Sequence, residues 1–412
     1  MLVVAAVVGA AVVALASRAP ASLRDFTPPQ SATDPSLGAH FTPKEIAQHG
    51  AFSRGGYVSF VVTMALTVLT LILLRKPVGA FVDRIERFPV SWPVVALATV
   101  LLVVVVVTVV TLPAAFVRGY QSQHAWHLST QSVAGWFSDQ ARSLLVTGVT
   151  AALAALAFFG AVRWQPRVWW LWAWAGLSLL TIAIVYLYPI VITPLFNRFT
   201  PLHDASLNAR IHQIADQAGV PIDRVLVADA SKRSITENAY VAGFGSSRRL
   251  VLYDTLLRGH TEDEVLFVVA HELGHYKHNH VLKGALLSVI GLFVTLGVLA
   301  WLARSDRLWA WAGAGGIRDI RAVPMLLLFA VVATLLTLPV QNTISRHFES
   351  QADSVAFALT ADPDVAVRSF RQIALTNLAD LAPPRIAVWA LFTHPPTADR
   401  IEAALAHRSS SP

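Results

Sequence analysis

The feature that most constrains the fold of this chain is a set of long apolar segments that are almost free of charged residues. A helix of about 20 apolar residues crosses the roughly 30 Å hydrocarbon core of a bilayer, and these segments are about that long. Charged residues make up 14% of the chain, against about 25% in a soluble globular domain. The sequence therefore predicts a membrane protein with these long spans: Tyr57 to Leu74, Val94 to Leu112, Leu144 to Val162, Val168 to Ile192, Gly284 to Leu302 and Val323 to Val340.

A further apolar stretch, Leu2 to Ala16, is short for a span and is followed by Ser17 and Arg18. It fits either a first membrane helix or the apolar core of a signal peptide cleaved after the residues ALAS. A signal peptide normally begins with positive charges, and no charged side chain precedes this stretch. We therefore expect residues 1–17 to be retained as a helix, which makes about seven transmembrane helices.

Cysteine content and charge exclude several classes of function. The chain has 412 residues and no Cys, which excludes disulfides, thiolate zinc ligands and a Cys nucleophile. A metal ion would have to be held by His and carboxylate side chains. The net charge of +7 is spread over the loops without a long basic run. We therefore expect no nucleic acid partner, and we expect the loop arginines to contact anionic headgroups of the lipid bilayer.

Two stretches have the composition of a soluble domain, and the last two spans separate them. In the first stretch, Asp204 is expected to cap a helix that ends at Gly219. Residues Arg224 to Asp229 alternate as a strand does, and residues 238–244 and 249–253 form an expected hairpin across Gly245-Ser246-Ser247. The expected organisation is residues 1–192 with the first five spans, residues 193–283 and 341–412 as the two parts of one soluble domain, and residues 284–340 with the last two spans.

The stretch Thr261 to Val281 reads TEDEVLFVVAHELGHYKHNHV and carries a metal-binding pattern. Thr261 and Glu264 form a capping box that starts a helix. His271 and His275 share one face of that helix with Glu272 beside them, which is the HExxH pattern. Two neutral imidazoles in this arrangement bind Zn²⁺, and the carboxylate takes a proton from the attacking water. The alternative is a helix that carries two solvated histidines.

A catalytic zinc site needs a third protein ligand, and Glu349 is the best candidate for it. The extended pattern HExxHxxGxxH is absent, because neither of its last two fixed positions holds the required Gly or His. Glu349 lies in SRHFESQADSVAFAL, a predicted helix just after the last span. Asp353 follows one turn later, where it could accept the free N–H of a liganding imidazole. The alternatives are a solvated acidic face paired with Arg346, or His278 as the rival ligand, with His280 at the surface or behind the ligands.

Beyond this motif, the sequence resembles the integral-membrane zinc proteases of the CAAX prenyl protease type 1 family and, more distantly, the HtpX heat-shock proteases. The resemblance covers about residues 190 to 405. Seven spans favour the prenyl-protease branch, because HtpX has fewer. The resemblance implies a mainly α, polytopic membrane protein with a zincin-like metalloprotease domain that contains a small β-sheet. It is carried in order by ITPLFNRFTPL (192–202), SKRSITENAYVAGFG (231–245), HELGH (271–275), SRHFESQAD (345–353) and THPPTADRI (393–401).

The resemblance also implies roles for the residues of the metal site. One Zn²⁺ per chain would be held by His271, His275 and Glu349. Glu272 would act as the general base. Asp353 matches the family's aspartate behind the ligands.

Residues in two other motif blocks match positions near the substrate. Asn238, and with it Tyr240 in the strand 238–244, would contact an extended peptide that adds to the strand edge. His394 would lie near the oxyanion, and Arg400 would brace the site. The alternatives are an ordinary HPP turn and a simple ion pair between Arg400 and Asp399.

The expected activity is zinc-dependent hydrolysis of peptide bonds in membrane-associated proteins or peptides. Prenylated C-terminal tails are the family's best-known substrate, but a bacterial member could instead clear damaged membrane proteins, as an HtpX-like protease does. Glu237 departs from the prenyl-protease branch, which tends to have a small polar residue there, so the substrate stays open. An intramembrane site-2-type protease is disfavoured because HELGH lies in a polar helix. An inactive zinc-bound membrane scaffold is the non-enzyme alternative.

The orientation in the membrane is open to two opposing arguments. The resemblance implies a bacterial cell membrane with the zinc domain facing the cytoplasm, and we adopt that placement. The loops 75–92 and 303–322 would then lie outside, yet each carries four Lys or Arg residues. Loop 113–143, which would lie inside, carries two. The positive-inside rule therefore favours the opposite orientation.

Overall fold

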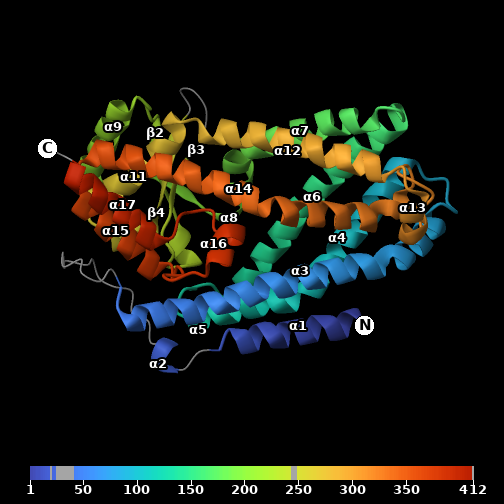
Figure 1. Cartoon of the computed structure of the whole chain (residues 1–412), viewed down its shortest axis with the longest axis horizontal. Coiled ribbons are helices and arrows are strands. Elements are labelled where there is room, and N and C mark those ends of the chain that lie inside the picture. Colours follow the sequence, from blue (N-terminus) through green and yellow to red (C-terminus); the bar gives the residue numbers. More distant parts are fainter. Residues whose placement is uncertain (19–20, 25–40, 243–247, 411–412) are drawn as a thin grey trace.

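The computed structural model describes residues 1–18, 21–24, 41–242 and 248–410. Long helices run along the molecule, and a small sheet with shorter helices lies at one end of it, which we call the sheet end (Figure 1). The bundle consists of α1 (Leu2–Ala16), α3 (Pro43–Ile85), α4 (Trp92–Phe116), α6 (Val133–Trp164), α7 (Trp169–Leu187), α12 (His280–Leu302) and α14 (Val323–Thr360). Shorter segments between them are α2 (Ala21–Arg24), η1 (Val117–Ser122), α5 (Gln123–Ala125), η2 (Tyr188–Ile192), α8 (Thr193–Phe196), α13 (Asp306–Ala312) and η5 (Ile320–Ala322).

Six helical segments in the described ranges are long and apolar enough to cross a membrane. Each of the six long spans expected from the sequence falls within, or largely within, one of them. The seventh expected span, α1, has 15 residues, so it is about 22 Å long and shorter than the hydrocarbon core. Its Ala6 and Val13 are buried against Leu66 of α3 and against Val110 and Ala114 of α4. About seven membrane helices is therefore consistent with the structure, with α1 as the short one.

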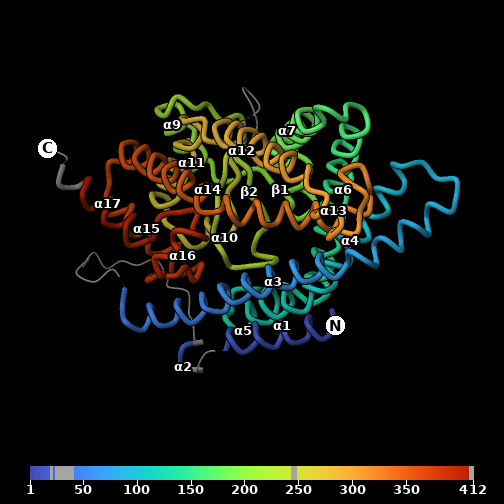
Figure 2. The backbone as a smooth tube through the Cα atoms, turned by 45° about the vertical axis from the view of Figure 1, so that its right-hand side comes forward, coloured from blue at the N-terminus to red at the C-terminus, as the bar shows by residue number. Residues whose placement is uncertain are grey.

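Helix α14 joins the membrane bundle to the sheet end without a break. Its 38 residues include Pro339, and the span expected to end at Val340 continues into the helix that carries Glu349. Proline is tolerated inside membrane helices because neighbouring groups and local adjustments accommodate the freed carbonyl. In Figures 1 and 2, α14 and α12 run along one side of the molecule, and α3 and α1 along the opposite side.

The sheet has four strands in the order β1-β2-β4-β3, so β1 and β3 are its edges. Strand β2 pairs parallel with β4, whereas β1 and β3 pair antiparallel with β2 and β4 respectively. The expected hairpin is confirmed between β3 and β4, and its turn, 243–247, lies outside the described residues. The strands are β1 (Phe199–Pro201), β2 (Arg224–Ala228), β3 (Ala239–Ala242) and β4 (Arg249–Tyr253).

Helices cover the sheet and bury a core around it. Asp204 caps α9 by accepting hydrogen bonds from the N–H groups of Ser206 and Leu207, and Gly219 ends it at a φ of 71°, as the sequence predicts. The apolar faces of α9, α11, α15 and α17 pack with the strands into one cluster. The helical segments at this end are α9 (Ala205–Ala218), η3 (Ala230–Lys232), α10 (Asp254–Gly259), α11 (Glu262–Lys277), α15 (Pro363–Thr376), α16 (Arg385–Leu391) and α17 (Thr397–Ser410).

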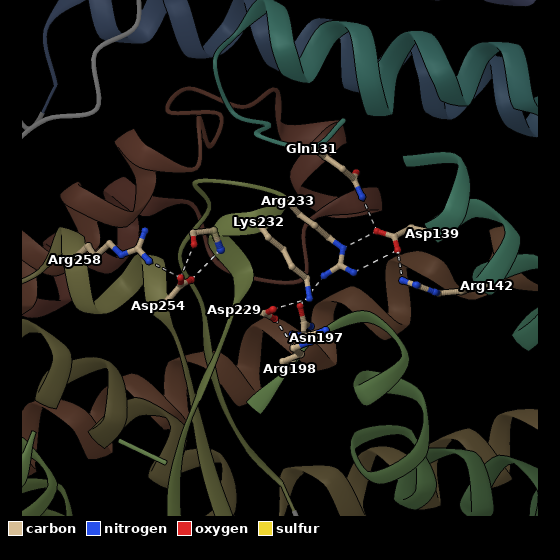
Figure 3. A network of polar contacts seen from close by, with 11 residues as sticks. Gln131, Asp139, Arg142, Asn197, Arg198, Asp229, Lys232, Arg233, Asp254 and Arg258 are labelled. Carbon is tan, nitrogen blue, oxygen red and sulfur yellow. Dashed lines mark hydrogen bonds and ion pairs between the residues drawn. The ribbon is translucent and has the colours of Figure 1, made fainter. Parts of the chain in front are cut away.

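A network of polar contacts ties the segment before β3 to the membrane helices (Figure 3). Arg233 contacts Asp139 of α6 at 2.5 Å and donates to Asn197 at 2.9 Å. Main-chain bonds run alongside, from the N–H of Thr130 to the carbonyl of Arg233 and from the N–H of Ile235 to the carbonyl of Leu128. The bundle therefore fixes where the chain enters strand β3.

Candidate active site

Helix α11 forms where the sequence predicts it and buries its apolar side. Thr261 and Glu264 make the capping box in both directions. Val265, Phe267 and Leu273 are almost fully buried in the core at the sheet end. This packing fixes the helix, so that His271 and His275 face Glu349 of α14.

Helices α11 and α14 meet at Gly274. A Cβ added there would lie 2.9 Å from both the Cα and the carbonyl oxygen of Ala352. Only glycine permits so close an approach. The result is that Glu349 and Asp353, on neighbouring turns of α14, lie beside the two histidines of α11.

His271, His275 and Glu349 bring their ligand atoms together within 4.8 Å of one another. The two Nε2 atoms are 3.1 Å apart. Glu349 Oε2 lies 3.2 Å from His271 Nε2, and Glu349 Oε1 lies 3.4 Å from His275 Nε2. Glu349 Oε2 is buried and accepts no hydrogen bond, which is costly unless a cation satisfies it. Two imidazole nitrogens and one carboxylate converging on a point are a donor set that fits Zn²⁺.

Asp353 holds His271 from behind. His271 Nδ1–H donates to Asp353 Oδ1 at 2.8 Å, which leaves Nε2 as the free lone pair. Arg400 in turn donates to both oxygens of Asp353, at 2.9 and 2.6 Å. Burial alone would lower the pKa of His271, but the hydrogen bond to Asp353 and the neighbouring carboxylate of Glu349 raise it to about 9. This set of side chains therefore favours a positive charge at its centre.

The structure places His280 behind His275, which is one of the two positions that the sequence left open for it. His280 is buried, and its Nδ1 lies 2.9 Å from Nδ1 of His275. Its Nε2–H donates to Gln351 Oε1 at 2.9 Å. Because Nε2 of His275 faces the cluster, its Nδ1–H donates to His280. The row of hydrogen bonds from His275 to His280 and Gln351 thus orients the second imidazole, as Asp353 orients the first. His278 is outside the three-residue cluster.

A cavity of about 870 Å³ opens beside the cluster, and its lining includes Glu272, Asn238, His394 and Arg400. Burial raises the pKa of Glu272, although the neighbouring histidines act in the opposite direction. His394 Nε2 lies 3.2 Å from Glu349 Oε2. With His271, which also lines it, the structure brings five of the residues singled out in the sequence to one cavity.

Tyr240 lies elsewhere. It lines a second cavity of about 600 Å³ together with His275 and Tyr253. Asn238 and Ala239 line the first cavity and Tyr240 the second, so the strand β3 runs from one cavity to the other.

A helical membrane bundle that presents an HExxH helix to a glutamate of a second helix has the architecture of a membrane-embedded metalloprotease. Comparison with known proteins agrees. The peptidase family M48 model matches residues 201–408, and the model for the CAAX prenyl protease N-terminal region, with five membrane helices, matches residues 44–198. The chain belongs to peptidase family M48, and it is a multi-pass membrane metalloprotease.

Individual relatives span most of the chain. The uncharacterized metalloprotease YhfN of Bacillus subtilis is 33% identical over 73% of this chain and 70% of its own. CAAX prenyl protease 1 of Saccharomyces cerevisiae is 28% identical over 72% of this chain and 69% of its own. The crystal structure of S. mikatae Ste24p superposes with a TM-score of 0.77 at 22% identity, covering 98% of both chains. The fold is therefore Ste24p-like.

Proposed function

We propose that this protein is a zinc-dependent endopeptidase that hydrolyses peptide bonds of membrane-associated proteins or peptides. The observation that carries the proposal is the convergence of His271, His275 and Glu349 at the edge of the cavity that Glu272 lines. These three residues would hold one zinc ion. When bound, zinc supplies a Lewis acid and makes a water molecule a nucleophile near neutral pH.

The protein's own groups carry the proton transfers. The Glu272 carboxylate takes a proton from the attacking water and then gives it to the nitrogen of the leaving amine. A raised pKa suits both steps, because a group whose pKa lies closer to neutral pH can both accept and release a proton. The His394 side chain, which lines the same cavity, donates a hydrogen bond to the carbonyl oxygen as negative charge develops there.

Strand β3 provides a template for the substrate. It is an edge of the sheet, and Asn238 and Ala239 line the cavity next to Glu272. An extended peptide that pairs with this edge gains main-chain hydrogen bonds whatever its sequence. Tyr240, on the same strand, would contact the part of the peptide that reaches the second cavity. Arg400 and Asp353 would position His271 without touching the peptide.

The substrate class and the location belong to the same proposal. The relatives named CAAX prenyl protease 1 support a peptide with a prenylated C-terminus as one substrate. We infer the broader activity on membrane-associated peptides, in a bacterial cell membrane with the zinc site facing the cytoplasm. The match to a Bacillus subtilis protein supports the bacterial setting.

The test compares the wild type with Glu272→Gln on a farnesylated peptide and on the same peptide without the lipid. We expect the wild type to cleave and the variant to be at least about 100-fold slower, with one zinc per chain in both. Glu262→Gln is the matched control, because Glu262 lies in the first turn of the same helix and pairs with Arg210 at the surface. Turnover retained by Glu272→Gln would refute the assigned base.

The same assay separates the substrate classes. Cleavage of the farnesylated peptide alone would establish prenyl specificity. Equal cleavage of both peptides would indicate a quality-control protease of the HtpX kind. Bound zinc without cleavage of either peptide would support an inactive scaffold.

A further inference from the structure

Arg118 lies on the helical segment Trp92–Ala125, which contains a candidate membrane span, and it follows the end of the apolar run expected to cross the membrane. It lies on η1, a six-residue π-helical segment that follows α4. A π-helical segment is rare and often occurs at a functional site.

The surroundings of Arg118 fix its guanidinium but leave part of it unbonded. Nη1 donates to the carbonyl of Phe52 and to Ser122 Oγ, both at 3.2 Å. The guanidinium also lies over the Phe52 ring, 4.0 Å from the centroid. Gly56 leaves room for it, since a Cβ there would lie 3.2 Å from Nη2. Among the residues that the structure describes, none accepts a hydrogen bond from Nε or Nη2 of Arg118 or forms an ion pair with it.

Arg118 lines the same cavity as Glu272. The other arginine in the lining, Arg400, is held by Asp353. Two further carboxylates of the lining also have partners: Glu237 contacts His260, and Asp380 accepts from the Tyr57 hydroxyl. Arg118 is thus a pre-positioned cation in a substrate-sized cavity, without a carboxylate partner in the described part of the chain.

We propose that Arg118 binds a carboxylate of the peptide substrate and thereby sets where the peptide sits relative to Glu272. This inference rests on the proposed peptidase function. A guanidinium with two free N–H directions matches a carboxylate, which accepts two parallel hydrogen bonds. The carboxylate comes from one of two sources, the C-terminus of the peptide or an Asp or Glu side chain within it.

The experiment uses one cleavable peptide in three forms: with a free C-terminal carboxylate, with a C-terminal amide, and with each internal Asp or Glu replaced by Asn or Gln. The C-terminal source predicts that the wild type cleaves the free acid with a kcat/KM about 10- to 100-fold above that for the amide. If the carboxylate is a side chain, replacing one Asp or Glu of the peptide should lower kcat/KM by the same factor. Arg118→Gln should cleave all forms at the rate of the disfavoured one, and Arg118→Lys should keep part of the preference because it retains the charge without the fork.

Arg54→Gln is the control, because Arg54 is an exposed cation close by on α3 and is not among the residues of the cavity wall. It should behave as the wild type does. If Arg118→Gln slows every peptide form equally, or if the wild type does not discriminate between the forms, the proposal is wrong and the side chain only holds η1 in place.

Binding of the same peptides to the Glu272→Gln protein, measured by fluorescence anisotropy, tests the carboxylate site without turnover. Tighter binding of one acid form that is lost when Arg118→Gln is added supports the carboxylate site. If the wild type cleaves none of the peptides but this binding is seen, the proposed peptidase function is wrong and the Arg118 site stands. Cleavage without discrimination by charge refutes the Arg118 site alone.

Discussion

At the scale of single residues, His260 holds the start of β3 to the start of α11. Its side chain is fully buried, with Nε2 2.9 Å from Glu237 Oε2 and Nδ1 3.4 Å from Glu264 Oε2. Burial alone would lower the pKa of His260, but the hydrogen bonds and charges of the two glutamates raise it to about 9. Glu237 precedes Asn238, so this buried cluster supports the strand on which the proposed substrate binds.

The stability that His260 contributes should depend on pH. Its pKa in the folded state, about 9, lies above the ordinary value of 6.5, so the contribution is complete below pH 6.5 and is lost as the pH rises through 9. The pKa of Glu264 is lowered by His260 and the helix cap against the effect of burial, so its contribution is lost only in acid. In detergent, the difference in Tm between wild type and His260→Gln should be large at pH 6 and shrink by pH 9.5. His203→Gln, at an exposed loop position, should show little difference at either pH, and a His260→Gln difference that does not change with pH would contradict the ion-pair role.

The three residues of the candidate metal site could be predicted from the sequence, whereas for His280 the sequence left two positions open, at the surface or behind the ligands. HExxH places His271 and His275 by helix geometry alone, and extension of that helix would keep His278 near them as the rival ligand. Helix α11 in fact ends at Lys277, and Asn279 adopts a left-handed conformation with φ of 55°, which Asn tolerates well. The chain turns there, and the first residue of α12, His280, folds back onto His275. The local sequence pattern does not predict the turn at Asn279.

At the scale of elements, the site depends on how closely α11 approaches α14. Gly274 faces the backbone of Ala352 so tightly that an added methyl group has no flexible neighbour to displace. Overpacking of this kind costs about 1–3 kcal/mol. It would also separate the histidines on one helix from Glu349 on the other.

Gly274→Ala should therefore lower Tm, zinc content and peptidase activity together. Gly291→Ala is the control, since Gly291 is also in a helix but a Cβ there would meet nothing within 4 Å. That variant should match the wild type or be slightly more stable, because Ala favours helix over Gly. Zinc content measured by mass spectrometry and Tm in the same detergent check both variants. Full zinc binding by Gly274→Ala would show that the close approach is not needed for the site.

Elements with strong local signals were predictable, and those set by distant contacts were not. The caps at Asp204 and Thr261 and the alternation of 224–229 each depend on neighbouring residues, and all are found. The change of composition after Val340 predicts a domain boundary there, whereas the continuation of α14 across that position as one helix has no such local signal. The position of Arg118 in the cavity could not be predicted from the sequence, because it depends on contacts with Phe52 and Gly56 of another helix.

At the scale of the whole molecule, the end away from the sheet is rich in arginine for reasons of structure. Arg321 pairs with Asp83, Glu86 and Asp319 at 2.5, 2.8 and 3.1 Å. The guanidinium of Arg75 lies over the ring of Trp311 at 3.8 Å. These contacts join the C-terminal part of α3, and Glu86 just after it, to the segment 303–322 that contains α13. Cations that hold these two segments together are needed there in either orientation, so their number is a weak guide to which side is cytoplasmic.

Because the natural chain has no Cys, single cysteines give a direct test of orientation. Asp216→Cys on α9 and Arg307→Cys on α13 place exposed thiols at the sheet end and at the opposite end respectively. If the zinc site faces the cytoplasm of a bacterial host, a membrane-impermeant maleimide should label Arg307→Cys in intact cells and Asp216→Cys only after lysis. The physical reason is that the bilayer around the apolar helices separates the two thiols. Labelling in the opposite order would reverse the proposed orientation and would place the substrates of this protease outside the cytoplasm.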